Sequence, residues 1–242
     1  MNLEAVKYVK EAGIVIRNNL FPLFIPIIIR ALFLIPQKPD GPLNVSLFIS
    51  MILLLIIYPL VYGQYTEIIL HGREISYFEI FKTHWLNFFL VSILIGFPTL
   101  FLSALAMVFI KDAPVTEYTL WILMSGLTLY IFPLVFLLKK KLESITLGLK
   151  CLFGNFSFSL PLLLLSFVPL ILALLIEQQP LGQPGNSFRM IFNFGFLFVS
   201  VFIDFLAFIA ATLVLKDKLL KGDSANHSGQ ITRDVSYGKW KK

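Results

Sequence analysis

The chain has 242 residues, of which 57% are hydrophobic and only 14% are charged, and its mean hydropathy is +0.84. This number of polar side chains is too small to cover the surface of a water-soluble protein of this length. The composition therefore excludes a water-soluble globular protein and indicates that lipid surrounds the fold. The formal net charge of +6 arises from 20 Lys and Arg against 14 Asp and Glu, and we attribute it mainly to signals that orient a membrane protein.

Six apolar runs follow one another along the chain. A helix rises about 1.5 Å per residue and the hydrocarbon core of a bilayer is about 30 Å thick, so about 20 apolar residues suffice to cross it. Only the first and last runs contain a charged residue, Arg30 and Asp204 respectively. The runs predict six transmembrane helices, near 18–36, 45–63, 86–110, 118–138, 152–176 and 190–215.

The basic residues orient these helices. Sixteen of the 20 Lys and Arg fall in the N-terminal segment, the second and fourth connections and the C-terminal tail. The other three connections contain only Lys38, Lys111 and Arg189. Because cytoplasmic segments carry the excess of Lys and Arg, we expect both termini and the segments 64–85 and 139–151 to be cytoplasmic. The first run lacks a small-residue cleavage site, so we expect it to be retained as a span.

An internal repeat links the second and fourth connections. Residues 76–88 align with residues 144–156 without a gap, and each copy follows a run that ends in aromatic-Pro-Leu-Val-aromatic, Tyr58 to Tyr62 and Phe132 to Phe136. A looser echo lies near the N-terminus, from Lys10 to Pro22. The identical positions are Ser76, Lys82, Asn87 and Phe88 in the first copy and Ser144, Lys150, Asn155 and Phe156 in the second.

The repeat predicts an all-α, polytopic membrane protein of three helical hairpins, each led by a short interfacial helix on the cytoplasmic face. The hairpin units would be 1–63, 64–138 and 139–215 of a single membrane domain, 1–215. We expect the basic tail, 216–242, to be disordered and attracted to anionic lipid head groups. The interfacial helices are interpreted first as anchors in the membrane surface, with docking of a cytoplasmic protein partner as the alternative.

Asp204 and Arg30 are the intramembrane charged candidates. An ionised carboxylate within the bilayer costs at least about 2.5–3.5 kcal/mol on insertion scales, so Asp204 needs a compensating group. Arg30 is the obvious partner if its side chain extends inward. A structural ion pair between the first and last spans is the favoured interpretation, and a functional proton or substrate site, independent snorkelling and a protonated acid stay open.

Prolines and small residues within the spans are read mainly as packing features. Pro59 and Pro133 occupy matching positions of the repeat and predict helix kinks, which serve packing or, alternatively, a cavity or hinge. Gly96 and Gly126 are expected at close contacts between helices.

No recognised catalytic or metal-binding motif is present in the sequence. The three histidines are scattered, and the single Cys151 excludes an internal disulfide. We found no nucleophile elbow, zinc-protease motif or phosphate-binding glycine loop, and expect no metal, cofactor or nucleic acid. An enzyme is therefore the less favoured class, although missing motifs do not exclude one.

The repeated stretches, from Tyr58 to Gly63, Ser76 to Phe88 and Ser144 to Phe156, resemble those of bacterial six-span proteins related to the membrane domain of some glycerophosphodiester phosphodiesterases. The resemblance implies a multi-pass protein of the bacterial inner membrane and carries no activity, because the chain has no phosphodiesterase domain. We expect a non-enzymatic scaffold, envelope or accessory component. The alternatives are the membrane subunit of a transporter, such as an ATP-driven exporter permease, and a small lipid-modifying enzyme that uses Asp204 and Arg30.

Overall fold

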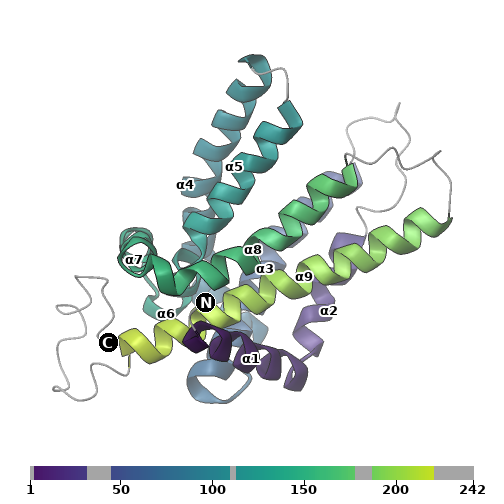
Figure 1. Ribbon diagram of the computed structural model, residues 1–242. Coiled ribbons are helices and arrows are strands. Elements are labelled where there is room, and N and C mark those ends of the chain that lie inside the picture. The colour runs from purple at the N-terminus through teal and green to yellow at the C-terminus, as the bar shows by residue number, and fades with distance from the viewer. Residues whose placement is uncertain (1–2, 32–44, 110–112, 178–186, 221–242) are drawn as a thin grey trace.

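The computed structural model describes residues 3–31, 45–109, 113–177 and 187–220, and these residues form helices without a strand (Figure 1). The elements in chain order are α1 (Leu3–Asn18), α2 (Phe21–Ala31), α3 (Val45–His71), α4 (Tyr77–Phe109), α5 (Ala113–Thr128), α6 (Ile131–Leu138), α7 (Leu142–Gly154), α8 (Phe156–Glu177), α9 (Ser187–Leu215) and the π-helical turn η2 (Lys216–Leu220).

Between four and six segments of the described chain are long and apolar enough to cross a membrane. Four qualify alone: Ile52–His71, Tyr77–Leu102, Thr119–Leu138 and Asn193–Leu219. Two further candidates are bent pairs, α1 with α2 at 85° and α7 with α8 at 108°. The expected all-helical, multi-pass class is therefore confirmed.

The long helices pack as a closed ring. α2 contacts α3, α3 contacts α4, α4 contacts α5, α5 contacts α8, α8 contacts α9, and α9 returns to α2. The short helix α6 packs against α3, α4 and α9, and α1 lies along α9 and α8. In Figure 1 the pair α4–α5 diverges from the group formed by α3, α8 and α9.

The two bent pairs have the same device at the bend. The side-chain nitrogen Nδ2 of Asn19 donates to the carbonyl of Val15 at 3.0 Å, and Nδ2 of Asn155 donates to the carbonyl of Cys151 at 3.0 Å. These asparagine bonds satisfy carbonyls that the ending helix leaves open. The structure thus supports the N-terminal echo of the repeat.

A buried tyrosine from another part of the chain is linked to each bend by hydrogen bonds, Tyr65 directly and Tyr130, in the turn before α6, through Ser159. The hydroxyl of Tyr65 on α3 donates to the carbonyl of Asn19 at 2.7 Å. The hydroxyl of Tyr130 lies 3.0 Å from that of Ser159, which in turn donates to the carbonyl of Asn155 at 3.0 Å. Both tyrosines are fully buried, so each bend is tied to the packed interior.

The middle unit differs from the expectation of a separate interfacial helix. Residues from Tyr77 open α4, which continues unbroken to Phe109. In α7 the aligned stretch ends at Gly154 and Asn155, two weak helix formers, whereas α4 has Leu86 before Asn87.

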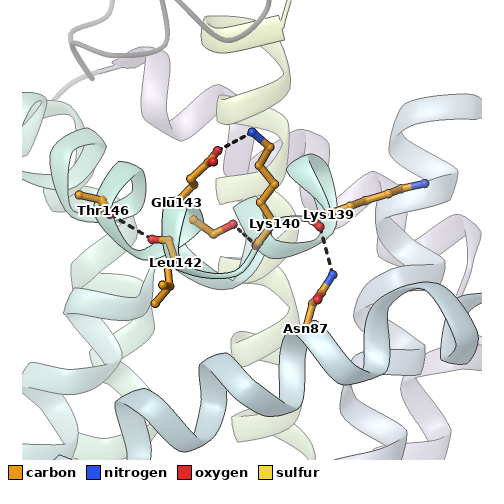
Figure 2. Close-up of polar contacts among 7 residues, drawn as sticks. Asn87, Lys139, Lys140, Leu142, Glu143 and Thr146 are labelled. Atoms are coloured by element: carbon orange, nitrogen blue, oxygen red, sulfur yellow. Dashed lines mark hydrogen bonds and ion pairs between the residues drawn. The ribbon is translucent and has the colours of Figure 1, made fainter.

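Asn87 bonds to another element rather than to its own helix. Its side-chain nitrogen donates to the carbonyl of Lys139 at 3.1 Å (Figure 2). Lys139 follows α6 with a left-handed backbone, φ 55°, as the C-cap of that helix. The repeated asparagine therefore bends the chain in one unit and joins two units in the other.

Two element boundaries also lie beyond their expected positions. α3 continues past residue 63 to His71, and this extension buries Gln64, Thr66 and Glu67. At the other terminus, residues 216–220 of the expected tail form η2. Residues 221–242 lie outside the described part of the chain.

The matching prolines have different effects. Pro59 sits inside α3, which remains helical on both sides of it. The chain turns at residues 129–130, just before Pro133, because a proline ring clashes with the carbonyl four residues earlier. Only Pro133 thus interrupts its span, separating α5 from α6.

The aromatic residues of the repeated motif meet in one cluster. The ring of Tyr62 stacks on Phe208 of α9 with centroids 4.0 Å apart and lies 6.1 Å from Phe136 of α6. Phe88 of α4 lies 5.9 Å from Phe136. Aromatic contacts of this kind add about 0.5–1.5 kcal/mol each beyond area burial, so the cluster fixes α3, α4, α6 and α9 together.

We predict that Gly148→Ala destabilises the protein, because a methyl group there would lie 2.6 Å from Cγ1 of Ile131 and 3.0 Å from its backbone. Overpacking of this kind costs about 1–3 kcal/mol. Gly13→Ala on α1 is the matched control, since nothing lies within 4 Å of its added carbon. The control should gain up to about 1 kcal/mol of helix propensity. Unfolding of both variants in detergent measures the difference, and equal stabilities would contradict the packing described.

Candidate functional site

A partly open cavity of about 610 Å³ lies between the pair α4–α5 and the group α3, α8 and α9. Its wall also includes Arg30 from α2 and Pro133 from α6. A volume between about 300 and 1,000 Å³ is typical of sites that hold a small organic molecule. The cavity is thus large enough for a ligand and draws its wall from every part of the helical ring.

Most of the cavity wall is apolar. Leu55, Ile95, Trp121, Phe132 and Phe196 are among the residues that line it. Several hydroxyls in the wall are already bonded to their own helices: Thr99 to the carbonyl of Ile95 at 2.9 Å, Thr128 to that of Met124 at 2.9 Å and Ser166 to that of Leu163 at 2.9 Å. The wall therefore offers mainly hydrocarbon and aromatic surface to an occupant.

Arg30 and Asp204 meet at this cavity. Nη2 of Arg30 lies 3.4 Å from Oδ2 of Asp204, which confirms the pairing expected from the sequence. They are the only charged residues among those that line the cavity, so the charges of the wall sum to zero. The pair joins the last turn of α2 to the middle of α9 and thereby links the first and last long helices of the ring.

Tyr58 completes the polar side of the cavity. The guanidinium carbon of Arg30 lies 5.2 Å from the centroid of the Tyr58 ring, a distance at which a cation is attracted to an aromatic face. The same ring stacks on Phe205, next to Asp204, at 5.5 Å. The Tyr58 hydroxyl is buried and has no hydrogen-bond partner among the described residues.

The polar residues of the repeat lie away from the cavity. Ser76 precedes α4, and its backbone carbonyl accepts a hydrogen bond from the backbone N–H of Ile80 at 3.1 Å. Ser144 is buried at the start of α7 and donates to the carbonyl of Lys140 at 2.5 Å. Lys82 and Lys150, which are aligned in the repeat, are both exposed.

Several polar side chains meet at the junction of α6 and α7. Figure 2 shows Lys140 reaching Glu143 and Asn87 reaching Lys139 across the junction. The Lys140–Glu143 pair is exposed, at 2.6 Å, and such surface pairs contribute little to stability. The polar residues of the repeat therefore lie outside the cavity wall and are not part of the candidate site.

The comparisons with known proteins add no further assignment. The chain matches no protein-family model, no curated protein and no solved structure. The fold and cavity define the chain as a multi-pass helical membrane protein with a partly open cavity and one ion pair in the wall of that cavity. Among the residues that the structure describes, no three His, Cys, Asp or Glu side chains form a metal-binding group.

We predict that Asp204→Leu and Arg30→Met each destabilise the protein by about 1–3 kcal/mol, because each leaves one charge without its partner. The double variant should recover much of that loss, since it removes both charges and keeps the volume. Thermal unfolding of the four proteins in one detergent gives the coupling. A double variant that loses the sum of the two single effects would show that the pair contributes no coupling.

Proposed function

We propose that this chain is a non-enzymatic, six-span protein of the bacterial inner membrane that holds a membrane-soluble molecule in its cavity and acts as an accessory, scaffold or envelope component. The observation that carries the proposal is the cavity of about 610 Å³, whose wall is apolar apart from one neutralised ion pair and scattered hydroxyls. Such a wall suits an occupant drawn from lipid rather than from water. The resemblance to bacterial six-span membrane proteins is part of this proposal.

The proposed topology has three hairpins with both termini in the cytoplasm. Contacts of α2 with α3, α4 with α5 and α8 with α9 support the hairpins. Lys218 lies 2.5 Å from Glu4, a contact that supports an even number of spans because it joins residues near the two ends of the described chain. The excess of Lys and Arg on the expected cytoplasmic side supports the orientation.

Membership in a transporter is the second candidate function. The α4–α5 pair diverges from the group of α3, α8 and α9 (Figure 1), and the cavity lies between them. This position favours the transporter, because relative movement of the two groups would change access to the cavity. A cytoplasmic ATPase that copurifies with the chain would support this candidate. A lipid-modifying enzyme would instead lose turnover when Asp204 or Arg30 is replaced in a variant that still folds.

We predict that a cysteine at position 41, 113 or 182 reacts only from the outside of the membrane. Positions 41 and 182 lie outside the described residues and were chosen from the sequence. The buried native thiol is first removed by Cys151→Ala, and Lys141→Cys on the cytoplasmic side is the opposite control. Labelling of intact cells with a membrane-impermeant maleimide gives the result, and labelling of Lys141→Cys alone would reverse the orientation.

We predict that Gly96→Phe displaces the molecule held in the cavity. Gly96 lines the cavity, and nothing lies within 4 Å of a carbon added there, so the ring can enter the open space. Gly195→Phe on α9 is the matched control, because that glycine also has nothing within 4 Å and is not among the cavity residues. The two variants carry the same added ring.

Native mass spectrometry of the purified proteins, supplied with a phosphatidylethanolamine and phosphatidylglycerol mixture, measures the bound lipid. The parent chain and Gly195→Phe should retain one lipid under conditions that strip the detergent, and Gly96→Phe should lose it. Equal retention by Gly96→Phe would place the lipid outside the cavity and overturn the proposed function.

A further inference from the structure

The ion pair in the cavity wall keeps hydrogen-bonding capacity on both partners. A guanidinium has five N–H donors in a planar fork and a carboxylate has two acceptor oxygens. The contact joins Nη2 of Arg30 to Oδ2 of Asp204 at 3.4 Å, and about 30% of each side chain remains accessible. Both side chains line the cavity, so the groups not engaged in this contact are available to an occupant.

The orientation of Arg30 is fixed from one side. The Tyr58 ring lies under its guanidinium at 5.2 Å, and Tyr58 is itself held by stacking on Phe205. A charged group supported in this way loses little freedom when a ligand binds, which favours recognition. The positive and negative groups thus form a fixed dipole in the cavity wall.

The charge balance selects the kind of head group that fits beside this dipole. An anionic head that approaches Arg30 would also approach the carboxylate of Asp204, and in a low-dielectric cavity that repulsion is strong. A cationic head would meet the same difficulty at Arg30. A head group that carries one negative and one positive charge can pair with both Arg30 and Asp204 and leaves the cavity neutral.

The remainder of the cavity suits hydrocarbon. Its lining from α4, α5 and α8 carries no charge and includes Ile95, Trp121, Met124 and Leu170. The hydroxyls on this side are those of Ser92, Ser125, Thr99, Thr128 and Ser166, and the last three donate to carbonyls of their own helices. A charged group in this part would lie away from Arg30 and Asp204, the charged residues of the wall, and would be disfavoured. We propose that the cavity binds a zwitterionic amphiphile, with its anionic group at Arg30, its cationic group at Asp204 and its chain along the apolar wall. The inference rests on the proposed function and names the ligand class.

The test compares three lipids of matched acyl chains on the full-length protein in a nonionic detergent: phosphatidylethanolamine, phosphatidylglycerol and diacylglycerol. Native mass spectrometry titrations give the affinity of each. The parent chain should bind phosphatidylethanolamine at least about tenfold more tightly than either of the others. Equal binding of all three, or tighter binding of phosphatidylglycerol or diacylglycerol, would overturn the inference.

A change of charge at constant shape should change the preference. Asp204→Asn leaves Arg30 as the only charge of the cavity wall, so phosphatidylglycerol should become the preferred lipid. Glu143→Gln is the matched control: it also removes one carboxylate, but from an exposed pair that is not part of the cavity wall, and should keep the parent preference. An unchanged preference in Asp204→Asn would also overturn the inference. If Asp204→Asn fails to fold, the preference of the parent chain decides.

The outcomes separate this inference from the proposed function. Loss of lipid in Gly96→Phe together with equal binding of the three lipids would keep a lipid in the cavity and reject the zwitterionic specificity. Retention of phosphatidylethanolamine by Gly96→Phe would reject the cavity as the site of any lipid, whatever the preference among head groups.

Discussion

The ion pair between Arg30 and Asp204 is the constraint on which the arrangement of the helices depends. Hydrocarbon offers a carboxylate neither water nor a counterion, so a partner for Asp204 stabilises α9 in a membrane. The partner comes from α2, near the opposite end of the sequence, at 3.4 Å. Pairing brings α2 against α9 and closes the ring that the remaining helices complete. A local charge balance thus determines a contact between distant parts of the chain.

The cavity follows from where the helices can and cannot approach. α5 comes close to α8 at Gly126, where an added carbon would lie 3.0 Å from the ring of Phe167. The expectation of a close helix contact at Gly126 is confirmed. At Gly96 the expectation is wrong, because that glycine faces open space in the cavity wall. Most of α4 is uncovered by other parts of the protein, so lipid is its main neighbour in the membrane.

The sequence predicted the all-helical, multi-pass class and the Arg30–Asp204 pair, because these depend on apolar length and on the cost of a charge in lipid. It did not predict where each helix would break. The same aligned asparagine follows the end of a helix at position 155 and bonds to Lys139 at position 87, because Gly154 ends α7 whereas Leu86 continues α4. The cavity could not be predicted from the sequence, because it depends on how far the helices diverge. The sequence identified Tyr58 only as part of a repeated motif and gave no sign that it lines a cavity.

The position of α1 has a consequence for biosynthesis. This helix is made before α9, yet it packs against α9, its residues Ala5, Tyr8 and Ala12 are buried, and Glu4 contacts Lys218. About 200 residues must therefore leave the ribosome before α1 finds its final neighbours. Because α1 has a charged face and an apolar face, it can lie on the membrane surface during that time. Docking of α1 against α9 therefore has to follow the synthesis of α9, and a nascent chain arrested before α9 would leave that side of α1 uncovered.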